Sequence, residues 1–178
     1  INYQDALAGP DASDHERIAK FLAAETILLS LQGVPGIYIH SLLGSRNDYY
    51  GKTTSGIPRR INREKLEFTY IREQLLGDSN RRKIFEEMIR RLEIRREESA
   101  FSPLSSQQVF QWKPEVLTFV RENGQTGSKV LVAVNVSGKT QQIVSSELKG
   151  IDLLSENKID GVLNLNPWEC AWIKTASL

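Results

Sequence analysis

The spacing of apolar residues changes near residue 105, and this change constrains the fold more than any other feature. Before it, apolar side chains recur every three or four residues, which is typical of amphipathic helices. After it, short runs alternate between apolar and polar residues, which is typical of half-buried strands. Phe101-Ser102-Pro103 marks the boundary. We therefore predict a chain of the α+β class with two domains, residues 1–105 and residues 106–178.

The first half begins with a predicted helix over residues 11–31. Ser13 is a suitable N-cap and Glu16 follows three residues later, which is the spacing of a capping box. Residues 34–39 (VPGIYI) are a short apolar run bounded by turn residues, and such a run predicts a fully buried strand. A helix that leads into a buried strand is typical of a parallel sheet or a (β/α)8 barrel.

Two more helices are predicted, over residues 67–76 and residues 80–98. Ile84 and Met88 belong to one apolar stripe of the second helix. Its arginines and glutamates interleave, which predicts a solvated face with ion pairs between successive turns rather than an RNA-binding arm.

The second half contains six predicted strands separated by turn residues. They cover Val109–Trp112, Val116–Arg121, Val130–Val136, Gln141–Ser145, Ile151–Leu154 and Leu163–Thr175. Short strands at this density predict an antiparallel β-sandwich.

Composition excludes several classes of function. The formal net charge is +1, which gives no electrostatic reason to expect nucleic acid or an anionic membrane as a partner. The single cysteine allows no disulfide within the chain, and no metal-ligand spacing is present. No apolar run is long enough to cross a bilayer. We expect a cytoplasmic protein without a cofactor.

Candidate site residues lie in the long polar stretch 40–66. If residues 34–39 are a barrel strand, this stretch leaves the end of the barrel where active sites form. The polar and aromatic residues that would rim such a site are His40, Arg46, Asn47, Asp48, Tyr49, Tyr50, Arg59, Arg60, Asn62 and Arg63. Arginines bind carboxylate or phosphate, and tyrosines stack on sugar rings.

Structural roles compete with these binding roles. His40 at a strand end is more often packed or hydrogen-bonded, and Arg46 is expected to pair with Asp48. The arginines of residues 59–63 are candidates for helix capping or for pairing with Glu64. Glycoside chemistry needs two carboxyl groups across the scissile bond, and the spacing of the acids near the rim singles out no such pair.

Two groups of residues resemble a known family. The runs Phe21–Ala24 and Ile27–Tyr38 resemble helix seven and strand eight of glycoside hydrolase family 13, the α-amylase superfamily. The segments His40–Asp48 and Arg59–Leu66 resemble its sucrose phosphorylase branch, which includes glucosylglycerate phosphorylases. The resemblance implies the last helix–strand–helix part of a (β/α)8 barrel followed by the family's C-terminal β-sandwich.

The resemblance implies retaining transfer of glucose from a small α-glucoside to inorganic phosphate. The family's three catalytic carboxylates lie on strands four, five and seven, which would precede Ile1, so no catalytic residue is predicted in this chain. The family's arginine that contacts phosphate or the acceptor aligns with Arg59, although Arg60 remains an alternative. Asp48, Asn62 and Arg63 are weaker candidates that would shape the loop or contact substrate.

The chain starts at Ile1 rather than at methionine, and we expect it to be part of a longer protein. Its partner would then be the missing N-terminal part of the barrel. Residues 1–100 would expose apolar surface meant for that part.

Two other functions remain open. One is an α-glucosidase or amylase-like hydrolase. The other is a noncatalytic carbohydrate-binding module formed by residues 106–178, for which Trp112, Trp168 and Trp172 are the cue. Core packing is the competing explanation for these tryptophans.

Overall fold

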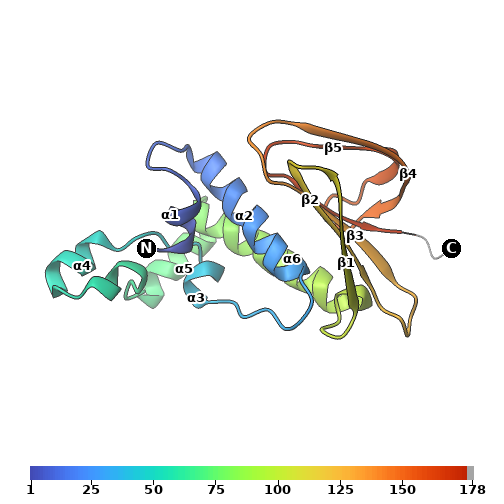
Figure 1. Ribbon diagram of the computed structural model, residues 1–178. Helices are drawn as coiled ribbons and strands as arrows, with labels where there is room; N and C mark the ends of the chain where they lie inside the picture. Colours follow the sequence, from blue (N-terminus) through green and yellow to red (C-terminus); the bar gives the residue numbers. More distant parts are fainter. Residues whose placement is uncertain (176–178) are drawn as a thin grey trace. The chain divides into compact units, whose positions relative to one another are not determined.

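The computed structural model describes residues 1–175 and divides into two compact units (Figure 1). The first unit comprises residues 1–22 and 36–90. The second comprises residues 23–35 and the described residues from 91 onward. Helices α2 (Asp14–Ser30) and α6 (Asn80–Glu97) each contribute to both units.

The first unit is helical. Besides the first parts of α2 and α6 it contains short elements: α1 (Tyr3–Leu7), α3 (Ile39–Leu42), α4 (Tyr49–Ser55), the 3₁₀ helix η1 (Pro58–Asn62) and α5 (Phe68–Leu76). Phe21, Ile84 and Met88 are fully buried in its core. The apolar stripe predicted for residues 80–98 is therefore confirmed, and so is the short helix predicted over residues 67–76.

Helix α2 begins where its cap was predicted. The Ser13 hydroxyl accepts a hydrogen bond from the Glu16 amide at 3.2 Å, which satisfies one of the unpaired donors of the first turn. The Glu16 carboxylate pairs with Lys20 at 2.8 Å, one turn further along. The helix ends at Ser30, and Gly33 follows with a φ of +104°.

The strand predicted over residues 34–39 is not formed. Residues 34–38 are irregular, α3 begins at Ile39, and Val34 is 83% exposed. A strand in a parallel sheet takes its backbone hydrogen bonds from neighbouring strands. None of the strands formed within residues 1–175 pairs with this segment, and Tyr38 and Ile39 are 50% and 52% exposed, whereas Ile37 is half-buried.

The solvated face predicted for α6 is only partly correct. Arg82 pairs with Glu86 at 2.7 Å, as the spacing of one turn suggests. Arg91, in contrast, is only 8% exposed, and its Nε donates to the Thr26 hydroxyl at 2.8 Å. Arg95 donates to the Gly33 carbonyl at 2.9 Å. In the second unit these two arginines therefore bind the end of α2 rather than water.

The second unit contains one six-stranded antiparallel sheet in the order β1-β2-β3-β6-β4-β5. The strands are β1 (Ser106–Lys113), β2 (Val116–Glu122), β3 (Lys129–Asn135), β4 (Gln141–Asp152), β5 (Lys158–Leu165) and β6 (Cys170–Lys174). Two predicted segments, Gln141–Ser145 and Ile151–Leu154, are joined in β4, whose pairing with β5 shifts between Val144 and Lys149. The last predicted strand is divided between β5 and β6.

Both faces of the central strand β3 are buried, which explains its unbroken run of apolar residues. On one face Leu131 and Ala133 belong to a core cluster that also includes Ile143 of β4 and Leu163 of β5. Phe110 of β1 packs against the same cluster, so side chains from both edge strands meet in one core, as the predicted β-sandwich requires.

The opposite face of the sheet is covered by helical segments of the same unit. Trp172 of β6 is fully buried there, its ring lies 4.6 Å from Phe101, and its indole N–H donates to the Ser30 hydroxyl at 2.7 Å. Core packing, one of the two explanations considered for the tryptophans, is therefore confirmed for Trp172.

Candidate functional site

The loop that connects α3 to α5 carries the five binding residues expected from the resemblance, which are Asp48, Arg59, Arg60, Asn62 and Arg63. Asp48 holds this loop together. Its Oδ1 accepts from the Gly51 amide at 2.7 Å, which caps α4, and its Oδ2 accepts from the Arg60 guanidinium at 3.3 Å. The Asp48 amide donates to the Ile61 carbonyl at 2.7 Å. A single residue therefore joins the start of α4 to η1.

Gly51 makes this arrangement possible. It is buried, and a β-carbon at this position would lie 2.0 Å from Oδ2 of Asp48 and 2.8 Å from a guanidinium nitrogen of Arg60. No side chain fits there without displacing the ion pair. The sequence offered no signal for this role, since Gly51 is preceded by two tyrosines and followed by an ordinary helical segment.

Asp5 of α1 forms a second anchor for the loop. Its carboxylate accepts from Nε of Arg46 at 2.5 Å, from the Asn47 amide at 2.6 Å and from Arg17 at 3.4 Å. The expected pair between Arg46 and Asp48 is therefore not formed, because each residue binds a different partner of opposite charge. Each pair holds part of the loop, with other partners than the competing interpretation expected.

The remaining site candidates differ in their surroundings. Arg59 and Arg63 are exposed, and Asn62 is half-buried. Within residues 1–175, the side chains of Arg59 and Arg63 have no hydrogen-bond or ion-pair partner. The structure therefore brings Asp48 and Arg60 together, whereas it leaves the charges of Arg59 and Arg63 in solvent.

His40 is packed and hydrogen-bonded, as the competing interpretation expected, in a polar network whose partners the sequence did not reveal. Its Nδ1 lies 3.0 Å from the hydroxyl of Ser45, which also accepts from Arg81 at 3.2 Å. Arg81 in turn pairs with Glu64 at 3.7 Å. Burial lowers the pKa of His40, the nearby Glu64 carboxylate raises it, and the charge of Arg81 lowers it. His40 is thus hydrogen-bonded within the fold.

Each acid near the proposed rim is paired with an arginine. Asp5 binds Arg46, Asp48 binds Arg60 and Glu64 binds Arg81. In the described part of the chain no group of three or more His, Cys, Asp or Glu residues is placed to hold a metal ion. No helix within residues 1–175 has the length and apolar character to cross a membrane.

Sequence comparison relates the chain to sugar phosphorylases. No family model matches it. It is 38% identical over 176 residues to the glucosylglycerate phosphorylase of Escherichia coli K12, covering 98% of this chain and 31% of that protein. It is 41% identical over 172 residues to the glucosylglycerate phosphorylase of Allomeiothermus silvanus, covering 95% of this chain and 30% of that protein. The chain thus spans about a third of the length of the curated relatives it matches.

Structure comparison finds solved structures with a similar fold. The structure of AmyP in complex with maltose superposes with a TM-score of 0.70 at 13% sequence identity, over 98% of this chain and 38% of that one. Pullulanase from Anoxybacillus superposes with a TM-score of 0.69 at 15% identity, over 96% of this chain and 25% of that one. At such low identity these matches show the fold alone. The resemblance predicted from the sequence is therefore confirmed, and the chain is a C-terminal segment of the glycoside hydrolase family 13 type, related to the glucosylglycerate phosphorylases.

Proposed function

We propose that this chain is the C-terminal portion of a phosphorylase that transfers glucose from glucosylglycerate or a similar small α-glucoside to inorganic phosphate. The observation that carries the proposal is the identity of 38% and 41% to two glucosylglycerate phosphorylases over nearly the whole chain. In the proposed enzyme the catalytic carboxylates come from the part of the barrel that precedes Ile1. This chain supplies the loop that contacts phosphate or the leaving sugar.

Arg59 is the residue that we assign to phosphate in the complete enzyme. Arg60 already compensates the charge of Asp48, whereas the guanidinium of Arg59 is exposed and unpaired within the described residues. Arginine binds phosphate through charge-assisted hydrogen bonds. In this proposal Asp48 and Arg60 fix the loop, and Arg63 and Asn62 contribute secondary contacts.

The missing N-terminal part of the barrel is the proposed partner of the first unit. Ile39, Ile57 and Phe68 are 52%, 54% and 79% exposed, and Tyr50 is 81% exposed. Large apolar side chains at this level of exposure are typical of surfaces that another part of a protein covers. The domain boundary at residue 105, a cytoplasmic location and the lack of a cofactor stay predictions.

The test uses the complete gene product that contains this chain. Glucosylglycerate or sucrose is supplied with inorganic phosphate, and glucose 1-phosphate is measured beside free glucose. We expect glucose 1-phosphate, formed at a rate that depends on phosphate. Free glucose released at the same rate without phosphate would instead establish the alternative, an amylase-like hydrolase, and would overturn the proposal.

Substitutions distinguish whether Arg59 or Arg60 contacts phosphate. Arg59→Ala is expected to raise the KM for phosphate about 10- to 100-fold, which corresponds to the loss of a charged hydrogen bond of about 1.5–3 kcal/mol. Arg72→Ala, on the exposed face of α5, is the matched control and should leave this KM unchanged. An unchanged KM in Arg59→Ala together with a large increase in Arg60→Ala would move the phosphate contact to Arg60.

A further inference from the structure

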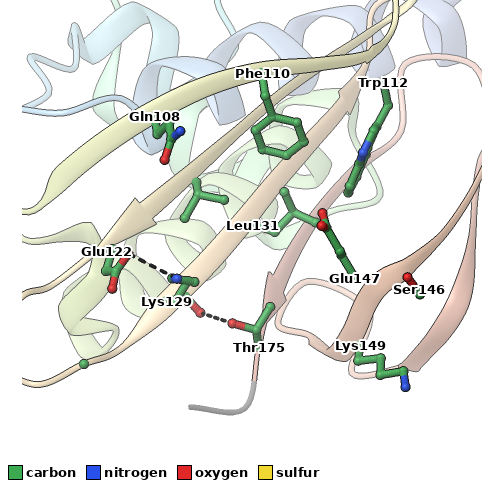
Figure 2. A pocket seen from close by; sticks show the side chains of 12 residues that line it. Gln108, Phe110, Trp112, Glu122, Lys129, Leu131, Ser146, Glu147, Lys149 and Thr175 are labelled. Carbon is green, nitrogen blue, oxygen red and sulfur yellow. Dashed lines mark hydrogen bonds and ion pairs between the residues drawn. The ribbon is translucent and has the colours of Figure 1, made fainter. Parts of the chain in front are cut away.

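A cavity of about 1150 Å³ opens in the second unit, beside the core of the β-sandwich (Figure 2). It lies between the edge strand β1 with its neighbours β2 and β3 and the irregular stretch of β4 between Val144 and Lys149. All of its lining residues belong to one unit. Its volume is slightly above the roughly 300–1,000 Å³ of most small-molecule sites, which have mostly apolar walls and a few polar groups.

Aromatic rings form one wall of the cavity. Phe110 and Trp112 occupy alternate positions of β1, and their ring centroids are 4.9 Å apart at an interplanar angle of 78°. Both side chains pack on the sandwich core but remain half-buried, and β1 is an edge strand of the sheet formed within residues 1–175. Trp172, in contrast, is fully buried. Part of the aromatic surface of β1 is therefore available to a ligand, and a sugar ring has an apolar face that fits it.

Charged side chains surround the opening in equal numbers of each sign. Glu122 pairs with Lys129 at 3.2 Å, and both remain more than 40% exposed. Glu147 and Lys149 stand on the irregular stretch of β4 and are exposed. Such a rim supplies both acceptors and donors but no net charge. It suits a neutral ligand rich in hydroxyl groups better than a phosphate or a nucleotide.

We propose that this cavity binds a neutral oligosaccharide, with its sugar rings against Phe110 and Trp112 and its hydroxyls on the charged rim. This site is separate from the loop of Arg59 and does not depend on the proposed phosphorylase activity. Binding there would hold the protein to a glucan without taking part in the transfer of glucose.

The test follows the indole N–H signals of the 178-residue chain by ¹⁵N NMR during titration with maltotriose. We expect the Trp112 signal, assigned with Trp112→Phe, to shift and saturate at millimolar sugar, while that of Trp172 stays in place. Glu147→Gln and Lys149→Gln should each weaken binding about 3- to 10-fold. Lys158→Gln, an exposed change outside the cavity, is the matched control.

Each outcome decides the proposal. No shift of Trp112 up to about 50 mM sugar, well above a millimolar dissociation constant, would overturn it. So would a shift caused equally by inorganic phosphate, or one weakened as much by Lys158→Gln as by the rim variants. An unmoved Trp172 signal in each variant shows that the fold is intact. Failure here would leave the phosphorylase proposal untouched, because that proposal is tested by product formation.

Discussion

Replacing the buried Arg121 by methionine tests how the helical segments of the second unit are held to its sheet. Arg121 is fully buried on β2, and its guanidinium donates to the carbonyls of Ser30, Ser102, Ser105 and Ser106 at 2.7–3.3 Å. Burial, together with the nearby charge of Arg95, lowers the pKa of Arg121 to about 10, so the group is still charged at neutral pH. The guanidinium of Arg121 therefore donates to four carbonyls, which belong to the end of α2, the loop before β1 and the first residue of β1.

The expected loss of stability in Arg121→Met depends on which of these four carbonyls water can reach once the guanidinium is gone. The bonds to Ser30 and Ser105 are buried, whereas those to Ser102 and Ser106 are partly exposed. An unsatisfied buried acceptor costs about 1–3 kcal/mol, so two of them cost about 2–6 kcal/mol. Relief from desolvating a guanidinium offsets part of this cost. We expect Arg121→Met, which keeps most of the apolar stem, to lower the free energy of unfolding by about 3 kcal/mol.

Urea unfolding followed by tryptophan fluorescence measures this change, since all three tryptophans lie in the second unit. With an m-value of about 2 kcal/mol/M, the midpoint should fall by about 1.5 M. Arg96→Met is the control, because that side chain is 75% exposed and the midpoint should hardly move. A midpoint for Arg121→Met equal to or above that of the unsubstituted chain would refute the reasoning, because desolvation would then outweigh the hydrogen bonds.

Four further experiments, three with substitutions and one by chemical labelling, test other features of the fold. Gly51→Ala places a methyl group 2.0 Å from the capping carboxylate and should destabilise the first unit by about 1 kcal/mol in urea, whereas Gly36→Ala, with nothing within 4 Å, should not. Gly150→Ala, at a φ of +159° and with its β-carbon 2.2 Å from a backbone carbonyl of β6, should lower the midpoint of the tryptophan-monitored transition, and an unchanged midpoint would contradict the geometry. Burial raises the pKa of the half-buried Cys170 thiol to about 11, so Ellman's reagent at pH 8 should modify it much more slowly in the native chain than after unfolding. Equal labelling rates in the native and the unfolded chain would disprove this. Burial lowers the pKa of His40 from its usual 6.5, so the unfolded state binds a proton on this imidazole more tightly than the folded state does. The free energy of unfolding, followed by the helical circular dichroism signal, should therefore fall as the pH drops below about 6.5. His40→Gln should flatten that pH dependence.

Local patterns predicted the elements that depend on local interactions. The helix after Ser13 and the helix over residues 80–98 follow from caps and periodicity, which act within a few residues. The prediction of a strand over residues 34–39 was wrong, because an apolar run alone does not reveal which strand would pair with it. The irregular stretch after Val144 was not predicted for a related reason. It shifts the pairing of β4 with β5 without ending the strand, and such a shift depends on the partner strand.

Charged residues were the least predictable part of the candidate site. Arg46 and Asp48 are two positions apart, yet they bind Asp5 and Arg60, whose positions depend on how the loop folds. Spacing along a helix likewise placed Arg91 in solvent, although its partner Thr26 lies on another helix. Pairing between residues that are far apart in the sequence cannot be predicted from local spacing.

The position of β6 in the middle of the sheet has a consequence for synthesis of the protein. This strand is the last one described along the chain, yet it lies between β3 and β4. While the ribosome still holds it, β3 and β4 each present an unpaired edge, and edges of that kind recruit other chains. We therefore expect nascent chains to depend on chaperones until Cys170–Lys174 emerges, and shortening the protein from its C-terminal side to promote aggregation rather than merely reduce stability.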